Sequence, residues 1–416
     1  MKLFLRYPLY FCVLSILVCS QVFCKGLEQY IPQKETIEKT DNDYLQMVMK
    51  GNNQFAFDLY NALKNRTENF VISPYALTAG LCMVGEGAKK ETHAEIQQAL
   101  HFSLNLAPLL KTIDQYLHAN SDYQRNFQLS LVNGIWLKNE KTLVPAYKFA
   151  LKRNFNFALE PLNFDVLSEA YSFINRWMSD QTKGKINSII SYQDISRETQ
   201  LLLTSGFYWK SEWQFPFDLK QTQRAPFISR GYSFNVDLMK QIEFISVSAQ
   251  PQFMVIELPY KPFQQGGAQL SLTILLPNED VSIETIGNAL GADKWYQIMS
   301  QLKPQLLELF LPKFRLDSKL DLSEALQKVG IRSAFNSSGQ FAGINEKNIF
   351  LSKVIQKAIT HIDENGSDTW TARQVFKPAI EEGLTPQSIK INRPFIFVIQ
   401  EMTTRLIISI GKIEQP

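Results

Sequence analysis

An alternating apolar and polar pattern near the C-terminus is the clearest structural signal in the chain. It covers Val354-Ile355-Gln356-Lys357-Ala358-Ile359-Thr360-His361-Ile362, and alternation at this period predicts a β-strand. The acidic turn Asp363-Glu364-Asn365-Gly366 follows, and apolar periodicity returns only in a second strand predicted for Ile391 to Ile399. Roughly two dozen structureless residues between strands are rare in a compact domain unless the loop is functional or disordered. We therefore expect this loop to be the working part of the molecule.

Apolar residues at helical spacing predict two helices in the first half of the chain. One helix is indicated by Phe55, Leu59 and Leu63, which recur at four-residue steps. The other is indicated by apolar positions that all match the helical template, namely Ala170, Phe173, Ile174, Trp177 and Met178. The folded domain should begin shortly before the first of these helices.

Capping residues and leucine-rich runs predict further elements. Ser73 followed by Pro74 suits the cap and the first position of a helix. Thr92 and Glu95 have the spacing of a capping box at the start of another helix. Strands are predicted where Leu270, Leu272, Ile274 and Leu276 alternate before Pro277, and in the buried runs Leu201-Leu202-Leu203 and Leu309 to Phe314.

Composition describes an ordinary globular protein with a large core. The chain has 416 residues, of which 45% are hydrophobic and 20% are charged. This length alone suggests two domains, but no linker or change of composition appears after about residue 50, so we expect one domain. The net charge of +3 is too small to imply a polyanion, and we expect no nucleic-acid partner.

The N-terminus has the pattern of a secretory signal. Lys2 and Arg6 precede the apolar stretch from Tyr7 to Val18, and the small residue Ser20 follows at a spacing that suits signal peptidase. An uncleaved membrane anchor is the alternative, although the apolar run is barely long enough to span about 30 Å of hydrocarbon. We assign residues 1–24 to the signal, 25–47 to a flexible polar extension and 48–416 to the folded domain. The mature protein is expected to be extracellular and not membrane-bound.

The sequence contains none of the common catalytic motifs. There is no Gly-x-Ser-x-Gly, His-Glu-x-x-His or Cys-x-x-Cys pattern. The histidines, at positions 93, 101, 118 and 361, are scattered, so we expect no catalytic residues, metal or cofactor. Cys12, Cys19 and Cys24 lie in the leader, which leaves Cys82 in the mature chain without an intramolecular disulfide partner.

A series of short motifs from about residue 50 to the C-terminus resembles the serpins, protease inhibitors with an exposed reactive loop. In chain order they are Asn69-Phe70-Val71-Ile72-Ser73-Pro74, Gly87-Ala88-Lys89-Lys90-Glu91-Thr92, Ile174-Asn175-Arg176-Trp177 with Thr182-Lys183-Gly184-Lys185-Ile186, Phe207-Tyr208-Trp209-Lys210-Ser211-Glu212-Trp213, Leu258-Pro259-Tyr260, Leu311-Pro312-Lys313-Phe314, Phe341-Ala342-Gly343-Ile344, Asn392-Arg393-Pro394-Phe395 and Gly411-Lys412-Ile413. Each motif alone is weak, but their shared order is specific. The resemblance implies an α+β fold with a large mixed central sheet, further sheets, about nine helices and a reactive loop at residues 366–390.

The resemblance also implies a mechanism. In serpins the target protease cuts the loop and forms an acyl-enzyme, and the cut loop then inserts into the central sheet before deacylation. The hinge at the start of the loop matches the family at Glu364, Gly366 and Ser367, and Thr369 and Thr371 suit a strand. Trp370 and Arg373 depart from the small residues usual there, and burial of an unpaired guanidinium costs several kcal/mol.

Two further groups of residues follow from the resemblance. Counting seventeen residues from Glu364 places the reactive bond at Ile380–Glu381, with bonds after Arg373 or Phe376 as alternatives. The region that opens to admit the loop is expected to contain Ser73, Ser205, Gln356, Trp213 and Lys313. The family usually has asparagine at the position of Ser205 and histidine at that of Gln356, but both replacements still form hydrogen bonds.

Two functions are consistent with the sequence. The first is a secreted, monomeric inhibitor of a serine or cysteine protease that acts as a suicide substrate. The alternative is a non-inhibitory binding or carrier protein on the same scaffold, which Trp370, Arg373 and Asp368 in the hinge favour. A polyanion-regulated inhibitor is disfavoured, because residues 100–120 contain a single lysine and no arginine.

Overall fold

The computed structural model describes residues 39–118, 127–138, 143–155, 158–262, 268–345, 349–366 and 384–416. A compact unit comprises Val48–Pro416, and Met1–Met47 forms a separate unit of which only the start of a helix is described. The described residues contain nine α-helices: α2 (Lys39–Leu63), α3 (Pro74–Glu86), α4 (Lys90–Leu100), α5 (Leu109–His118), α6 (Pro145–Asn154), α7 (Leu167–Gln181), α8 (Ile283–Asn288), α9 (Ala292–Ser300) and α10 (Ser323–Lys328). The α+β fold class predicted from the sequence is confirmed.

The strands form two sheets. The five-stranded sheet has the order β10-β11-β4-β2-β3, with β10 (Phe314–Asp321), β11 (Leu351–Ile362), β4 (Leu201–Ser211), β2 (Phe127–Lys138) and β3 (Ala158–Leu162). The larger sheet has the order β1-β14-β13-β8-β7-β6-β9-β12, and β5 pairs with β6. Its strands are β1 (Phe70–Ile72), β5 (Gln223–Ser229), β6 (Tyr232–Ala249), β7 (Phe253–Pro259), β8 (Leu270–Pro277), β9 (Lys303–Pro312), β12 (Gln387–Lys390), β13 (Phe395–Glu401) and β14 (Ile407–Ile413).

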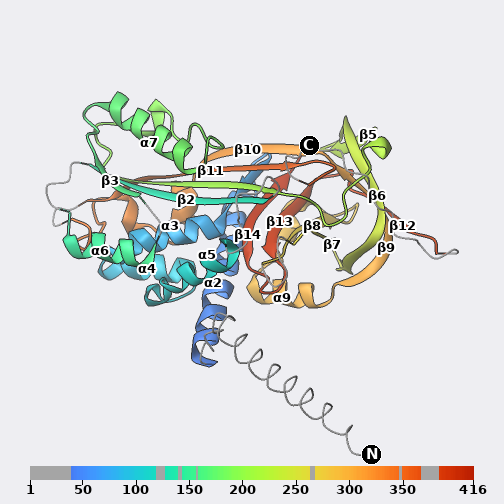
Figure 1. Cartoon of the computed structure of the whole chain (residues 1–416), viewed down its shortest axis with the longest axis horizontal. Coiled ribbons are helices and arrows are strands. Elements are labelled where there is room, and N and C mark those ends of the chain that lie inside the picture. The colour runs from blue at the N-terminus through green and yellow to red at the C-terminus, as the bar shows by residue number, and fades with distance from the viewer. Residues whose placement is uncertain are drawn as a thin grey trace, which may run out of the picture. The chain divides into compact units, whose positions relative to one another are not determined.

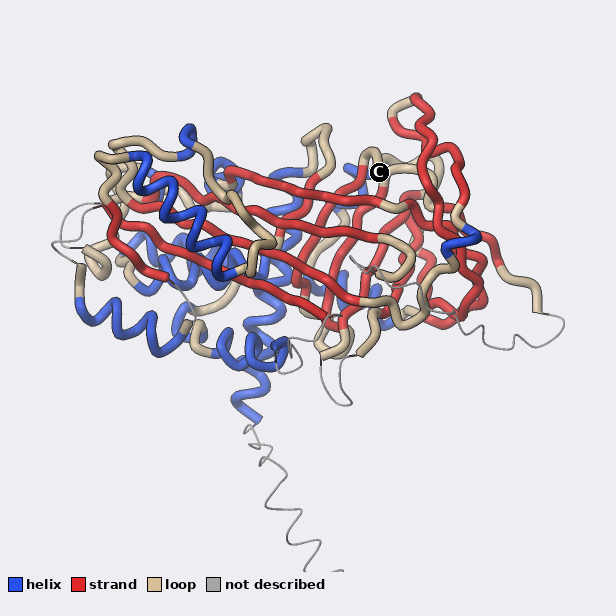
Figure 2. The backbone as a smooth tube through the Cα atoms, turned by 45° about the horizontal axis from the view of Figure 1, so that its top comes forward, coloured by secondary structure: helices blue, strands red, loops and turns tan. Residues whose placement is uncertain are grey.

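Helix α7 covers one face of the five-stranded sheet, and α3 packs on the other (Figures 1 and 2). The apolar face of α7 includes Ile174 and Met178, which are fully buried against Trp136 of β2 and Ile355 of β11. Trp177 approaches Trp136 edge to face, with 5.1 Å between ring centroids. The helix predicted for residues 170–178 is therefore confirmed, and its apolar spacing exists because it buries one side on the sheet.

The strand predicted for Ile391 to Ile399 is confirmed only from Phe395 onward. The chain instead forms the short strand β12, breaks at residues 391–394 and resumes as β13 at Phe395. Pro394 has no backbone N–H for a ladder, and the Asn392 carbonyl accepts a hydrogen bond of 2.8 Å from the Ile228 backbone N–H instead. The predicted reactive loop, 366–390, thus ends in a strand that pairs in parallel with β9.

The start of the first helix also differs from the expectation. Residues 39–47, which were expected to belong to a loose extension, begin α2, and this helix continues to Leu63. Residues 39–50 contain neither glycine nor proline, so nothing in them interrupts the helix that the later apolar positions define. The predicted signal peptide and the rest of the predicted extension lie outside the described residues.

The capping predictions had different outcomes. Ser73 is the N-cap of α3, its hydroxyl oxygen accepts a hydrogen bond from the Ala76 backbone N–H, and Pro74 opens the helix as predicted. The capping box at Thr92 and Glu95 is wrong, because α4 already begins at Lys90. Both side chains instead contact Ser333 of the segment before β11, at 2.8 Å from the Thr92 hydroxyl and 2.7 Å from the Glu95 carboxylate.

Candidate functional site

The site is the junction between β11 and β4, which we call the seam. The two strands run in parallel, with Leu351 opposite Leu201 at one end and Ile359 opposite Tyr208 at the other. The register shifts between Leu351 and Lys353, so the pairing is irregular near its start. The β2–β4 and β10–β11 junctions beside the seam are antiparallel. The seam is therefore the one parallel junction in the middle of this sheet.

Three fully buried polar residues form the central cluster of the seam: Ser73, Ser205 and Gln356. The Gln356 side-chain amide donates to the Ser205 hydroxyl oxygen across the seam, at 3.1 Å. It also donates to the Ser73 backbone carbonyl at 3.0 Å, and its own carbonyl accepts from the Ser73 backbone N–H at 2.8 Å. One neutral side chain thus joins β11 to β4 and to the start of α3.

The central cluster continues into the rest of the core through Ser73. Its hydroxyl donates to the backbone carbonyl of Ile408 in β14 at 2.7 Å while capping α3. Asn133 of β2 donates to the Ala76 carbonyl in the first turn of α3, at 2.9 Å. Hydrogen bonds to buried groups are costly to leave unmade, so these contacts fix the position of α3 under the seam.

A second group of polar residues, the edge cluster, lies where β11 ends: Thr222, Lys313 and Glu364. The Glu364 carboxylate is 2.9 Å from the Lys313 ammonium and accepts a hydrogen bond of 2.6 Å from the Thr222 hydroxyl. The Glu364 side chain is 5% exposed, and that of Lys313 is 33% exposed. Burial alone would raise the pKa of Glu364, but the hydrogen bonds from Thr222 and Lys313 outweigh it and lower this pKa.

Trp213 joins the chain after β4 to the turn after β11. Its backbone N–H donates to the Asn365 carbonyl and its indole N–H to the Asp363 carbonyl, both at 2.8 Å. The indole stacks on Tyr260, with 4.6 Å between ring centroids and an interplanar angle of 4°. The edge of the seam is therefore closed by backbone contacts as well as by the edge cluster.

Gly366 can only be a glycine in this geometry. Its φ of +132° disfavours any other residue, and an added Cβ would lie 2.2 Å from the Ser211 carbonyl oxygen. The preceding Asp363 carboxylate accepts hydrogen bonds from the Asn365 and Gly366 backbone N–H groups, which closes the turn. Mainly because it is buried, the pKa of Asp363 is raised. The turn after β11 thus requires a glycine at position 366 and a hydrogen-bond acceptor at position 363.

Comparison with known proteins identifies this arrangement. Residues 50–416 match the family described as serpin (serine protease inhibitor). The chain belongs to the serpin family. Iripin-2 of Ixodes ricinus is 28% identical to this serpin over 374 residues, covering 88% of this chain and 93% of Iripin-2.

Two further relatives show the range of the family. The leukocyte elastase inhibitor of Sus scrofa is 29% identical to this serpin, with coverage of 89% of this chain and all of the relative. The crystal structure of human thyroxine-binding globulin complexed with thyroxine superposes with a TM-score of 0.78 at 25% identity, covering 90% of this chain and 99% of the globulin. The names of these relatives thus describe both an inhibitor and a thyroxine-binding protein.

The structure of this serpin brings together the predicted sheet-opening residues in two places. Ser73, Ser205 and Gln356 meet in the central cluster, whereas Lys313 and Trp213 lie with Glu364 and Gly366 at the edge. The remaining predicted positions lie outside the described residues: the hinge residues Ser367, Thr369 and Thr371 and the reactive-bond residues Ile380, Glu381, Arg373 and Phe376. Their roles stay predictions.

Three residues of the edge were not assigned to the site from the sequence: Thr222, Asp363 and Tyr260. Asp363 was predicted only as part of the turn, because aspartate before a glycine three residues later is typical of a turn. Thr222 had none, since it lies in a polar segment and its partner Glu364 is 142 residues away in the chain. Long-range hydrogen bonds of this kind leave no periodic pattern.

Other chemistry is limited in the part of this serpin that the structure describes. It contains no group of acidic, histidine or cysteine residues suited to a metal ion, and no helix long and apolar enough to cross a membrane. Cys82 is buried in α3 and forms no disulfide, and burial raises the pKa of its thiol. A protonated, buried thiol is a poor nucleophile.

Proposed function

We propose that this serpin is a secreted inhibitor of a serine or cysteine protease that traps its target by inserting the cleaved loop into the seam. The observation that supports this most directly is the parallel pairing of β11 with β4, together with the turn at residues 363–366 that follows β11. A segment that leaves this turn toward the seam runs antiparallel to β11. Because β4 is parallel to β11, the same segment also runs antiparallel to β4.

Strand polarity gives the insertion a favourable direction. Opening the seam breaks one parallel ladder, and an inserted strand replaces it by two antiparallel ladders. Parallel pairing is slightly less stable per residue than antiparallel pairing, and each new hydrogen bond contributes roughly 1 kcal/mol. The closed seam is in this view a metastable state whose free energy is released when the strand is completed.

The protease would supply the covalent chemistry. Its nucleophile attacks the carbonyl of the reactive bond, for which Ile380–Glu381 is our first assignment, and the amine of the following residue leaves. An acyl-enzyme forms, and insertion of the loop then carries the enzyme away before water can hydrolyse the ester or thioester. This serpin needs no catalytic residue of its own for this series of reaction steps.

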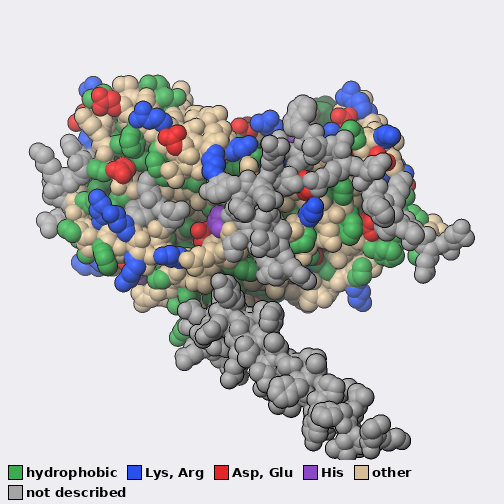
Figure 3. Space-filling model, viewed as in Figure 1, with side chains coloured by type: hydrophobic (Ala, Val, Ile, Leu, Met, Phe, Trp, Pro, Cys, Tyr) green, Lys and Arg blue, Asp and Glu red, His purple; other side chains and the backbone are tan. Residues whose placement is uncertain are grey.

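The surface is compatible with a protein partner. Figure 3 shows Lys or Arg and Asp or Glu side chains interspersed over the visible face, without one large area of a single sign. Because charges of both signs are mixed on this face, we expect the protease to bind the loop directly, without a polyanion that links the two proteins. We propose a monomeric, extracellular protein whose residues 1–24 are removed during secretion.

The proposal is tested by incubating the secreted protein with a panel of serine and cysteine proteases. A complex that survives boiling in detergent is expected with at least one enzyme, and calorimetry of the loop-cleaved protein should show a higher melting temperature. An increase of at least about 10 °C in the melting temperature is expected. The inserted strand adds several hydrogen bonds of roughly 1 kcal/mol each, and ~1 kcal/mol of added stability raises the melting temperature by roughly 2 °C in a chain of this size. An unchanged melting temperature after cleavage would falsify insertion.

A matched pair of hinge variants sharpens this test. Ser367→Arg places a guanidinium at the first residue to enter the sheet, and we expect it to convert the inhibitor into a plain substrate. Ser367→Ala keeps a small side chain there and should leave complex formation intact. If both variants form the covalent complex equally well, entry of the hinge into the seam is not required.

The alternative is a non-inhibitory carrier. Trp370 and Arg373 in the hinge favour it, as does the structural likeness to thyroxine-binding globulin. In that case cleavage still cuts the loop, but no covalent complex forms with any enzyme of the panel.

A further inference from the structure

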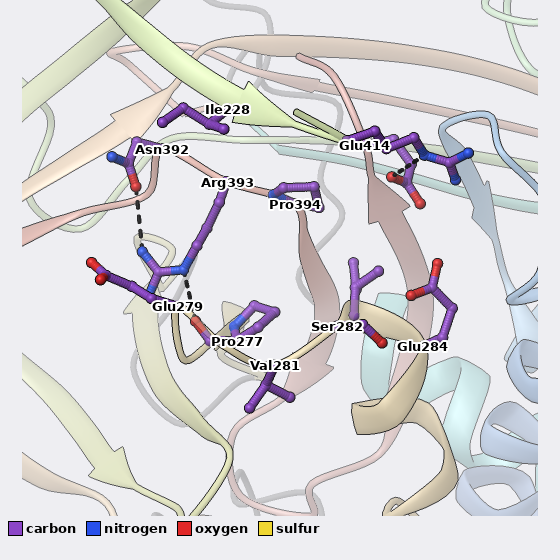
Figure 4. Close-up of a pocket in the computed structure, with 12 residues that line it drawn as sticks. Ile228, Pro277, Glu279, Val281, Ser282, Glu284, Asn392, Arg393, Pro394 and Glu414 are labelled. Carbon is purple, nitrogen blue, oxygen red and sulfur yellow. Dashed lines mark hydrogen bonds and ion pairs between the residues drawn. The ribbon is translucent and has the colours of Figure 1, made fainter. Parts of the chain in front are cut away.

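A pocket of about 730 Å³ lies on the larger sheet, away from the seam (Figure 4). Four segments line it: the end of β5, the link from β8 to α8, the link from β12 to β13, and Glu414 after β14. This volume falls in the range of small-molecule sites, about 300–1,000 Å³. The proposed inhibitory mechanism uses none of these residues.

One side of the pocket presents a guanidinium without a carboxylate partner. Arg393 Nε donates to the Pro277 carbonyl at 2.8 Å, and Nη1 donates to the Asn392 side-chain oxygen at 3.3 Å. Among the described residues no carboxylate lies within ion-pair distance of Arg393, and its Nη2 has no hydrogen-bond partner. Burial lowers the pKa of Arg393, and the more distant Glu279 carboxylate only partly offsets this. A half-buried guanidinium that lacks a carboxylate partner favours an anionic ligand group.

The opposite side presents a carboxylate without a cationic partner. Glu414 is neutralised there by Lys412 at 2.7 Å and by Arg230 at 3.4 Å, but Glu284 forms no ion pair within the described part of the chain. The Tyr60 hydroxyl is buried nearby, and its pKa is raised by burial first and then by the Glu284 and Glu414 carboxylates. This end of the pocket therefore favours a cationic ligand group.

Apolar side chains separate the two charges. Figure 4 places Arg393 and Glu284 on opposite sides of the pocket, with Pro277, Val281 and Pro394 around the space between them. Apolar walls with a few convergent polar groups are the usual composition of a ligand site. A ligand that satisfies all three features has a carboxylate, an apolar body and an ammonium group.

We propose that this pocket binds a small zwitterionic amphiphile of short-peptide size, with its carboxylate at Arg393 and its ammonium group at Glu284. A simple anion leaves Glu284 unpaired, and a simple cation leaves Arg393 unpaired. A zwitterion pairs both groups and buries its apolar body against the prolines and Val281. By contacting four separate segments it also stabilises the folded state.

The probe for this proposal is trileucine with free termini, titrated calorimetrically into the purified mature protein. N-acetyl-trileucine lacks the ammonium group, and trileucine amide lacks the carboxylate. We expect saturable binding of trileucine and at least about tenfold weaker binding of each blocked peptide, which is the usual worth of one charge-assisted contact.

Two variants assign each end of the peptide. Glu284→Gln should weaken trileucine about tenfold but leave the affinity for N-acetyl-trileucine unchanged. Arg393→Gln should weaken trileucine about tenfold but leave the affinity for trileucine amide unchanged. Arg393→Lys should restore part of the affinity for trileucine. Glu324→Gln on α10 and Arg315→Gln on β10 make the same charge changes at exposed positions and should not alter binding.

We expect Glu284→Gln to fold, because the Glu284 side chain forms no hydrogen bond or ion pair within the described part of the chain. If Glu284→Gln melts at the native temperature and binds trileucine as tightly as the native chain, the proposal is wrong. It is equally wrong if the native protein binds none of the peptides, or binds the blocked forms as well as the free one. None of these results depends on protease inhibition, so the inhibitory function is tested separately.

Discussion

The central and edge clusters close the same seam with different chemistry. The central cluster uses neutral amide and hydroxyl groups, and Ser73, Ser205 and Gln356 are at most 1% exposed. The edge cluster uses an ion pair, in which Lys313 keeps a third of its side chain in solvent. Charge is costly where burial is complete and tolerable where one partner is hydrated. Depth thus decides which kind of hydrogen bond the chain uses along the seam.

The chemistry of the two clusters also affects how easily the seam opens. A strand that enters the seam must break the Gln356–Ser205 hydrogen bond and must separate Gly366 from its backbone partner Glu212. Neutral hydrogen bonds are exchanged at a small net cost if new partners replace them, and an inserted strand can supply such partners. A buried ion pair at the centre would make the same opening far more costly.

The largest effect is expected when charge is placed in the central cluster. Gln356→Glu puts a carboxylate oxygen opposite the Ser73 carbonyl and removes the donor to Ser205. We expect the free energy of unfolding at pH 7 to fall by about 3–5 kcal/mol, the usual cost of an uncompensated buried charge. Chemical denaturation measures this, and Gln327→Glu on the exposed face of α10 is the matched control, with an expected change within about 0.5 kcal/mol.

The pH dependence of this variant has a definite sign. Burial raises the folded-state pKa of the new carboxyl above its unfolded value, so the folded state binds the proton more tightly. Stability lost at pH 7 should therefore return as the pH falls through the raised pKa toward about 4.3. A deficit that stays constant over this range would show that shape, and not charge, is what the central cluster rejects.

The converse substitution at the edge should cost less. Glu364→Gln removes the ion pair with Lys313 and weakens the hydrogen bond from Thr222, and we expect a loss of about 2 kcal/mol at pH 7. The native pKa of Glu364 is lowered, so its stabilisation is present above the unfolded value and is lost as the pH falls through the folded value. The difference between variant and native protein should accordingly vanish in acid, as denaturation curves at successive pH values can show.

These two clusters also mark what the sequence could reveal. The strand that became β11, the turn at Asp363 to Gly366 and the Ser73 cap follow from local alternation and turn chemistry. Grouping Ser205 and Gln356 with Ser73 required the family resemblance, because nothing local links residues so far apart in the chain. Strand β12 was missed because Gln387–Lys390 is mostly polar and forms only through pairing with β9.

A smaller effect is expected for the single hydrogen bond that crosses the seam at its centre. Ser205→Ala and Gln356→Ala, made separately and together, form a double-mutant cycle for the 3.1 Å contact between the two side chains. We expect a coupling of about 1 kcal/mol, the typical worth of a buried neutral hydrogen bond. A coupling near zero would mean that the two residues act through the backbone of α3 and not across the seam.

The smallest effect is expected at the hydroxyl of Thr222. Thr222→Val keeps the shape of the side chain but removes the 2.6 Å hydrogen bond to the Glu364 carboxylate, and water can partly replace it because Thr222 is only half buried. The free energy of unfolding should fall by about 0.5–1 kcal/mol. The pKa of Glu364 should rise, because a hydrogen bond to the charged form is lost while Lys313 remains. Titration of Glu364 followed by NMR measures the shift, and Thr285→Val, at an exposed position on α8, is the control. If this pKa does not move, Lys313 alone sets the charge of Glu364, and the edge cluster reduces to a single ion pair.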